Sequence, residues 1–126
     1  MPINSRQKGK RGEREAASYL RSIGFQTARR TQQYNGEGKS DVTIDALPDL
    51  HIEVKFGYPV TRFDLCTGLF RAACEQAKGD AAGKSWVVLW KPLRYKVWRL
   101  TYDGGRGYPI TVSGDAAIAD VIAWLA

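Results

Sequence analysis

Apolar and polar side chains alternate without interruption in LHIEVKF, the segment of residues 50–56. Because successive side chains of a β-strand point to opposite faces of a sheet, this period of two predicts a strand. Its leucine, isoleucine, valine and phenylalanine form the face toward the core, and the other face carries His51, Glu53 and Lys55. A slip of one residue would exchange the two faces, so the pattern also determines the register of pairing.

The preceding segment predicts a partner for this strand. Apolar and polar side chains alternate over residues 42–46, and a Leu-Pro-Asp turn at residues 47–49 follows. Two such strands joined by a short turn form a hairpin. Asp41 opens the first strand, so we expect its carboxylate to lie beside Glu53 and Lys55.

Two carboxylates and one ammonium group in one place suit the chemistry of a hard cation. Mg²⁺ prefers oxygen ligands and is usually held by one or two carboxylates, water and substrate phosphate. A cation on Asp41 and Glu53 would polarise a phosphodiester and lower the pKa of a bound water. Lys55 would stabilise negative charge in the transition state. The spacing alone is weakly specific, because acidic and basic residues alternate on many solvated strand faces with surface ion pairs. Both interpretations stay open at this point.

A helix is predicted over residues 8–23, where apolar residues recur at helical spacing. Glu13 lies three and four positions before Ala16 and Ala17 and so extends their apolar stripe toward the protein body. An inward carboxylate is unfavourable unless it is paired or binds a metal. The alternative is a stabilising position near the positive end of the helix dipole.

A second helix is predicted over residues 63–82. Gln76 continues the stripe of Leu65, Leu69 and Ala72, which places it toward the sheet. There it would form a helix-to-strand hydrogen bond or contact a scissile phosphate or its water.

The other expected elements complete one domain over residues 1–126, with the order αβββαββα. That order indicates an α/β (α+β) fold with a mixed sheet flanked by helices. The remaining predictions are a flexible basic arm at 1–8, strands at 25–31, 85–90 and 95–101, and a helix at 115–125.

The net charge of +6 is unevenly distributed. Residues 1–39 hold nine basic and three acidic side chains, whereas residues 40–126 hold ten of each sign. A basic segment of this kind favours an anionic partner. The basic side chains expected around the carboxylates, as phosphate contacts, are Arg6, Lys8, Lys10, Arg11, Arg14, Arg29, Arg30 and Lys39.

Several classes of protein are excluded by the residues that are missing. No apolar run approaches the ~20 residues of a membrane span, and the basic start lacks the apolar core of a signal peptide. One histidine and two cysteines are too few for a zinc cluster. Cys66 and Cys74 are therefore interpreted as reduced thiols of a cytoplasmic protein.

Several short motifs together resemble the archaeal-type Holliday-junction resolvases and their phage members, within the PD-(D/E)XK nuclease superfamily. The resemblance covers roughly residues 8–100. In chain order, the motifs are Gly9–Glu15 (GKRGERE), Gly24-Phe25, Arg29-Arg30, Ser40-Asp41, Glu53-Val54-Lys55, Glu75-Gln76-Ala77, and Gly83-Lys84 before the strand that begins at Trp86.

The resemblance implies a restriction-endonuclease-like fold and a role for each matching residue. Asp41 and Glu53 match the metal ligands, with the Val54 carbonyl as a further ligand, and Lys55 matches the catalytic lysine. Glu13 matches a helix carboxylate near the metal or its water. The proline usually found before the first aspartate is replaced by Ser40, which matches a serine that assists cleavage in some relatives and is grouped with the DNA-binding residues.

The expected function is a Mg²⁺-dependent endonuclease, with Mn²⁺ as a substitute, that cuts branched DNA as a Holliday-junction resolvase in recombination and repair. Two symmetric nicks fit a homodimer, and the segment SWVVLW at 85–90 and the last helix are its expected contacts. One alternative is a nuclease of the same fold that acts on flaps, single strands or duplex sites. Another is a nucleic-acid-binding module without catalysis.

Overall fold

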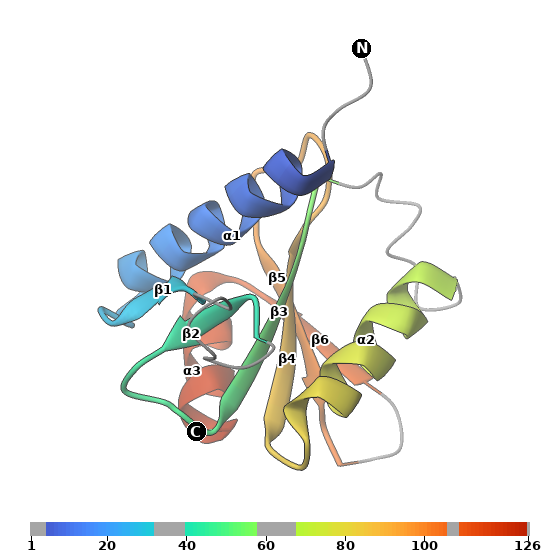
Figure 1. Cartoon of the computed structure of the whole chain (residues 1–126). Coiled ribbons are helices and arrows are strands. Elements are labelled where there is room, and N and C mark those ends of the chain that lie inside the picture. Colours follow the sequence, from blue (N-terminus) through green and yellow to red (C-terminus); the bar gives the residue numbers. More distant parts are fainter. Residues whose placement is uncertain (1–4, 32–39, 58–67, 106–108, 126) are drawn as a thin grey trace.

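The computed structural model describes residues 5–31, 40–57, 68–105 and 109–125, and at 5–8 and 68–72 it describes the backbone alone (Figure 1). Three helices and six strands follow one another in the order αβββαβββα. The elements are α1 (Ser5–Ser22), β1 (Ala28–Arg30), β2 (Val42–Ile44), β3 (Leu50–Phe56), α2 (Gly68–Ala81), β4 (Ser85–Lys91), β5 (Arg99–Asp103), β6 (Pro109–Ser113) and α3 (Asp115–Leu125).

The six strands form one mixed sheet in the order β1-β2-β3-β4-β5-β6. The pair β3–β4 is parallel, and each of the other neighbouring pairs is antiparallel. A parallel pair needs a crossover connection, which here contains α2. The registers Glu53↔Val88 and Lys55↔Trp90 place the polar side chains of β3 on the same face as the α2-side core.

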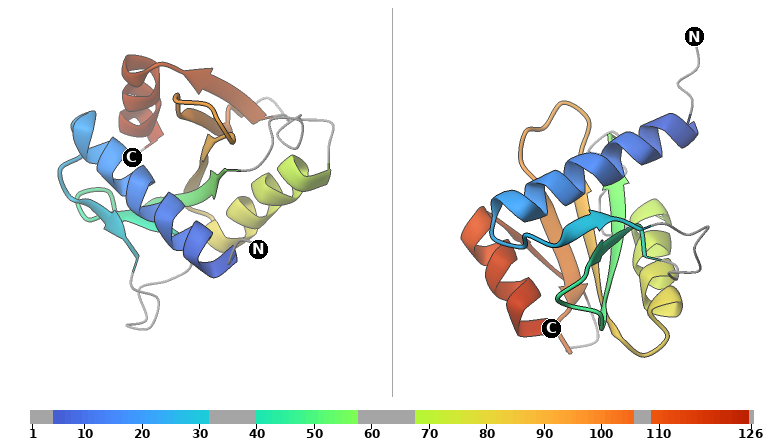
Figure 2. Two further views of the ribbon diagram at one scale, coloured as in Figure 1. Left: turned by 90° about the horizontal axis from the view of Figure 1, so that it is seen from above. Right: turned by 60° about the vertical axis from the view of Figure 1, so that its left-hand side comes forward.

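The helices form a layer on each side of the sheet, with α1 and α3 on one face and α2 on the other (Figures 1 and 2). The larger core lies between the sheet and α1 and α3, and includes Leu20, Ile52, Leu100 and Ile118. A smaller core of Cys74, Ala77, Ala81, Trp86, Val88 and Trp90 lies under α2. The mixed α/β architecture predicted from the sequence is confirmed.

A glycine allows α1 to approach β3 closely. A Cβ atom added to Gly12 would lie 2.5 Å from Cβ of Phe56 and 2.9 Å from its Cγ. Such contacts would push the helix away from the strand. Gly12 therefore fixes the depth at which the next residue, Glu13, is held over the sheet.

Most predicted elements are present, with shifted ends. α1 begins at Ser5, so residues 5–8 of the predicted arm belong to a helix, and residues 1–4 lie outside the described residues. β1 is shorter than the predicted strand at 25–31. For α2, the predicted residues 63–67 lie outside the described part, and the helix ends at Ala81 because Ala82 and Gly83 both have positive φ.

Two predictions near the end of the chain are wrong. The strand expected at 95–101 is β5 at Arg99–Asp103, because residues 93–97 form an exposed connection in which the apolar alternation has no neighbouring strand. β6 was not predicted at all. It is a half-exposed edge strand that begins with Pro109, so it lacks a strong apolar pattern, and a proline is tolerated at such a position.

The predicted dimer contact through β4 is also wrong. β4 is paired with β3 on one side and β5 on the other, and Trp86 to Trp90 are buried within the chain. It therefore offers neither a free edge nor an apolar face to a partner. No helix in the described part of the chain is long and apolar enough to cross a membrane.

Truncation of a core leucine tests the packing. Leu100 is fully buried between the sheet and the α1–α3 layer, so Leu100→Ala should lower the free energy of unfolding by about 2–5 kcal/mol. The matched control is Leu93→Ala, because Leu93 is 48% exposed and its truncation should change stability by less than about 0.5 kcal/mol. Urea denaturation measures both, and equal effects would contradict the described packing.

Candidate functional site

Asp41 is fastened to the middle of β3 by two hydrogen bonds. Its backbone N–H donates to the carbonyl of Ile52 at 2.9 Å, and its carboxylate Oδ2 accepts from the N–H of Val54 at 2.8 Å. Glu53 lies between these two partners and is 2% exposed. The hairpin therefore brings Asp41 and Glu53 together, as the alternation in the sequence predicted.

The proximity of the two carboxyl groups changes the ionisation of Asp41. Burial, together with the negative charges of Glu53 and Glu13, raises the pKa of Asp41 to about 8. The hydrogen bond from the Val54 N–H lowers that pKa but does not offset the other causes. The site thus concentrates negative charge that a bound cation would neutralise.

Glu13 completes the group from a different element. Its side chain is 23% exposed, and its Oε2 accepts a hydrogen bond from Nε of Arg30 at 3.0 Å. This partial burial agrees with the predicted inward orientation on α1, and the charge of Glu13 makes the smallest contribution to the raised pKa of Asp41. Arg30, expected to contact phosphate, instead pairs with this carboxylate.

His51 is a member of the site that sequence reasoning missed. It is 4% exposed, its Nε2 lies 2.8 Å from Oε1 of Glu53, and its Nδ1 lies 2.9 Å from Oγ of Ser40. A carboxylate oxygen only accepts hydrogen bonds, so Nε2 donates to Glu53, and the Ser40 hydroxyl, which can donate or accept, satisfies Nδ1. The signal was available, because His51 and Glu53 share one face of a strand with a period of two.

A second group of potential metal ligands shares Glu53. One ligand atom each from His51, Glu53 and Asp80 lie within 4.8 Å of one another. Asp80 comes from the last turn of α2, and it was also absent from the predicted site. A nitrogen ligand beside carboxylates suits Mn²⁺ and other transition metals better than Mg²⁺.

The remaining predicted residues of the catalytic group have different positions. Lys55 is half-buried on the same face of β3 as Glu53, two residues further along. Gln76 is exposed, so its predicted orientation toward the sheet is wrong. The sheet-facing stripe of α2 runs through Ala73, Ala77 and Ala81, because small side chains let that helix pack closely on the sheet.

The predicted phosphate contacts divide into three groups. Lys10, Arg11 and Arg14 are exposed along α1, with Arg11 also paired to Glu15 at 3.2 Å. Arg29 is paired to Asp45 at 3.0 Å, and Ser40 is bonded to His51. Arg6 and Lys8 lie in α1 where the backbone alone is described, and Lys39 lies outside the described residues.

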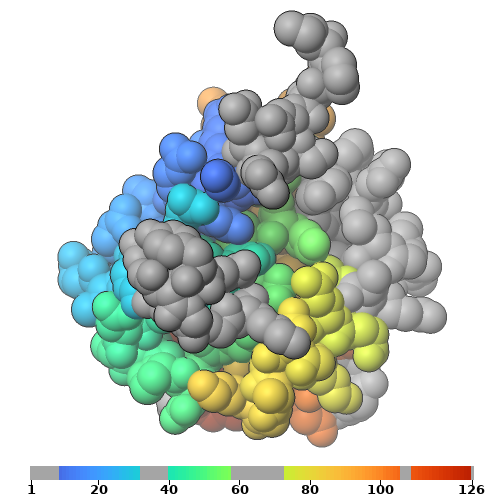
Figure 3. All heavy atoms as spheres, in the orientation of Figure 1, coloured from blue at the N-terminus to red at the C-terminus, as the bar shows by residue number. Residues whose placement is uncertain are grey.

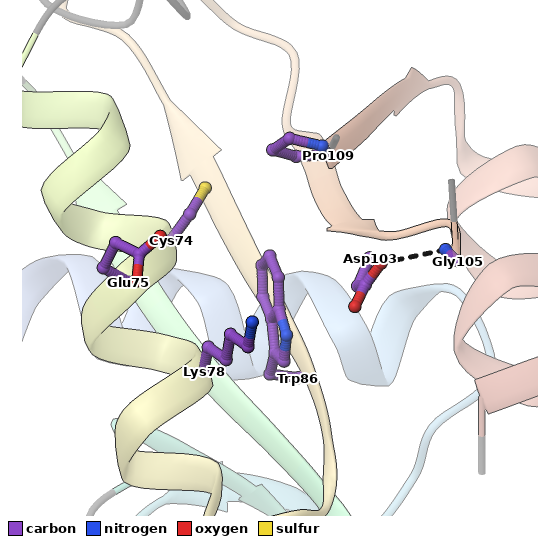
Figure 4. Close-up of a pocket in the computed structure, with 7 residues that line it drawn as sticks. All are labelled: Cys74, Glu75, Lys78, Trp86, Asp103, Gly105 and Pro109. Atoms are coloured by element: carbon purple, nitrogen blue, oxygen red, sulfur yellow. Dashed lines mark hydrogen bonds between the residues drawn. The ribbon is translucent and has the colours of Figure 1, made fainter. Parts of the chain in front are cut away.

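Two cavities of about 320 Å³ lie on the α2 side of the sheet. The first is lined by Ser40, His51, Asp80 and Lys84, among others, and gives access to the histidine end of the site. The second lies between α2 and the β5–β6 end, away from the carboxylates, with Trp86 and Lys78 in its wall (Figure 4). In the space-filling view, β3 is visible between α1 and α2 (Figure 3).

Comparison with known proteins identifies no relative. No protein-family description matches the chain, and neither a curated protein nor a solved structure matches it. The positions of its own side chains therefore carry the functional argument.

The raised pKa of Asp41 predicts how the stability of the metal-free protein depends on pH. The unfolded chain ionises Asp41 near its ordinary pKa of 3.8, whereas the folded chain holds the proton to about pH 8. The unfolded state thus binds fewer protons in this interval, and the free energy of unfolding should fall as the pH rises from 3.8 to about 8.

Asp41→Asn should remove most of this slope, because the amide oxygen still accepts from Val54 while the charge is gone. Asp45→Asn is the matched control, since Asp45 is 53% exposed and pairs with Arg29 at the surface. Urea denaturation in EDTA at several pH values measures the slope. A slope unchanged by Asp41→Asn would contradict the described crowding of carboxylates.

Proposed function

We propose that this protein is a Mg²⁺-dependent DNA endonuclease with the PD-(D/E)XK fold, and that its substrate is branched DNA of the Holliday-junction type. The observation that carries the proposal is the position of Asp41, which is bonded to Val54 beside the buried Glu53 of β3 and is also influenced by the charge of Glu13 on α1. A solvated strand face with a surface ion pair, the structural alternative, does not account for a glutamate that is 2% exposed.

The residues present fit a hard cation. Asp41 and Glu53 supply carboxylate oxygens from adjacent strands, and the Val54 carbonyl is the proposed third protein ligand. Mg²⁺ usually keeps several waters and one or two carboxylates, so this donor set is sufficient. A divalent cation would also offset the charge crowding that raises the pKa of Asp41.

When bound, the cation would supply Lewis-acid polarisation of the phosphodiester and a more acidic water. The chain supplies the rest of the chemistry. Lys55 lies beyond Glu53 on the same strand face, where its ammonium group would stabilise charge on the phosphate. Glu13, held by Arg30, would orient the attacking water or accept its proton.

The basic face of α1 supports DNA as the substrate. Lys10, Arg11 and Arg14 are exposed on the helix that also carries Glu13. Phosphate contacts of this kind hold the duplex without reading its sequence. Cleavage of a junction at two symmetric positions would need a two-fold dimer, and with β4 excluded as its contact, α3 remains the proposed surface.

Substitution of the two proposed ligands tests catalysis. Asp41→Asn and Glu53→Gln should each reduce Mg²⁺-dependent cleavage of a labelled four-way junction by at least about a hundredfold. Binding of the junction in EDTA should be retained or tightened, because neither change adds negative charge near phosphate. A flap and a linear duplex, assayed in parallel, identify the preferred substrate.

Glu15→Gln provides the matched control for this experiment. Glu15 lies on the same helix as Glu13 but pairs with Arg11 and Lys91, away from the carboxylate group. This variant should cut at close to the normal rate. Cleavage by Asp41→Asn or Glu53→Gln at that same rate would reject the site, and binding without any cleavage by the unaltered protein would favour the non-catalytic module.

His51 provides a separate test of how Glu53 is held. A residue that orients a ligand typically changes metal affinity by about ten- to a hundredfold when it is lost. His51→Phe should therefore weaken Mg²⁺ and Mn²⁺ binding by similar factors in calorimetric titrations, and His51→Gln, which can still donate to Glu53, should restore part of the affinity.

The comparison of the two metals distinguishes orientation from direct ligation. If the His51 imidazole is itself a ligand, its loss should weaken Mn²⁺ binding much more than Mg²⁺ binding, because nitrogen ligands favour the transition metal. A far-ultraviolet circular dichroism spectrum equal to that of the unaltered protein shows that each variant is folded. Unchanged affinities for both metals would exclude both roles.

A further inference from the structure

Exposed apolar side chains gather on one connection of the fold. Of the four large hydrophobic side chains that are exposed in the described part of the chain, three lie between β4 and β5. Leu93 is 48% exposed, Tyr95 43% and Val97 53%, and the fourth, Trp124, lies on α3. Contiguous exposed apolar groups commonly mark an interaction surface.

The same connection is basic. Residues 92–98, PLRYKVW, contain two basic side chains and no acidic one, and Lys91 and Arg99 flank them at the ends of β4 and β5. Arg94 and Lys96 alternate with the exposed apolar residues, and both are exposed themselves. Nucleic acid with unpaired bases complements such a surface, because its phosphates pair with the cationic groups and its flat base faces contact the apolar ones.

Arg94 has a left-handed backbone conformation, which in a turn is usually found at glycine. The N–H of Tyr95 donates to the carbonyl of Pro92 at 3.1 Å, which closes a four-residue turn with Arg94 in its third position. The φ angle of Arg94 is +69°. Turns with positive φ at this position usually have glycine or asparagine there, so the arginine side chain is retained despite backbone strain.

The connection is anchored rather than loosely attached. Trp98, which is 5% exposed, stacks on Tyr19 of α1 at 5.9 Å and on Phe56 of β3 at 6.0 Å between ring centroids. The guanidinium group of Arg99 lies over the ring of Tyr95 at 5.8 Å. Such contacts fix the exposed side chains in place before a partner binds, which reduces the entropy lost on binding.

The anchored connection leaves the sheet beside the proposed active site. β3 and β4 are parallel and end together, with Phe56 opposite Lys91, so the connection starts about 10 Å along the sheet from Glu53. It rises beside α1 (Figures 1 and 2). The distance from Glu53 is well within one turn of duplex DNA, about 34 Å.

We propose that the connection of residues 92–98, here called the branch loop, contacts unpaired or unstacked bases where duplex arms meet. Tyr95 would stack on these bases, Leu93 would make apolar contact with them, and Arg94 and Lys96 would contact the flanking phosphates. This inference rests on the proposed function and assigns its preference for branched DNA to a surface outside the carboxylate site.

Binding measurements in the catalytically inactive Asp41→Asn background test the branch loop. Adding Leu93→Ser, Tyr95→Ser and Val97→Ser should weaken binding to a four-way junction about tenfold or more, as expected for lost base stacking, and weaken duplex binding less than about threefold. Fluorescence of 2-aminopurine at the branch point should change with the parent protein and not with the triple variant. Equal losses on junction and duplex would overturn the proposal.

Two further variants separate a loss of contacts from a loss of folding. Arg94→Gly relieves the positive-φ strain, so it should not lower the melting temperature, yet it should weaken junction binding and reduce the slope of log affinity against log salt by about 0.9. Gln26→Ser changes an exposed side chain in the turn between α1 and β1 and should leave junction binding unchanged. Junction binding unaffected by Arg94→Gly would count against the branch loop.

The outcomes also distinguish failure of this inference from failure of the proposed function. If the unaltered protein cuts junctions in Mg²⁺ but the triple variant in an otherwise unaltered chain keeps the same preference for junctions, only the branch loop is wrong. If the unaltered protein cuts no DNA, the proposed function fails first. Binding to phosphatidylserine vesicles, or monomerisation of the triple variant in sedimentation, would reassign the branch loop to a membrane or to a second copy of the chain.

Discussion

The hydrogen bonds between Asp41 and β3 are the constraint on which the site depends. One joins backbone to backbone at Ile52, and the other joins the Asp41 carboxylate to the N–H of Val54. Together they hold a second carboxylate against Glu53 in a place where burial disfavours charge. Without them the two groups would separate to relieve their repulsion, and Glu13 would face a strand with one carboxylate instead of two.

The surrounding fold keeps this unfavourable arrangement in place. β3 is central in the sheet, with the larger core on one face and α2 on the other, so Glu53 cannot turn toward water. Gly12 lets α1 lie close enough for the charge of Glu13 to act on Asp41, and Arg30 offsets part of that charge. His51 and Ser40 hold Glu53 from the other side. The carboxylates that the proposed metal would bind therefore lower the stability of the metal-free fold at this point of the sheet.

Basic residues serve two purposes that the net charge alone does not separate. Arg29 and Arg30 make ion pairs within the fold, whereas Lys10, Arg11 and Arg14 lie exposed along α1. The branch loop adds a second exposed basic surface in the half of the chain whose charges balance. The net charge of residues 40–126 does not reveal this surface, because acidic residues elsewhere in that segment balance its positive charges.

The sequence by itself determined β3, its two faces and the hairpin with Asp41, because a period of two leaves one register that buries the apolar side chains. It also determined the inward side of α1 at Glu13. Only the tertiary structure decided which polar groups meet from distant elements. It brought Asp80 of α2 to His51 and Glu53, paired Arg30 with Glu13, turned Gln76 to solvent, and placed β4 inside the sheet, where it cannot be the predicted dimer contact. These outcomes depend on how α2 crosses over the sheet and on packing of small side chains such as Ala73 and Ala77, which carry little apolar signal in the sequence.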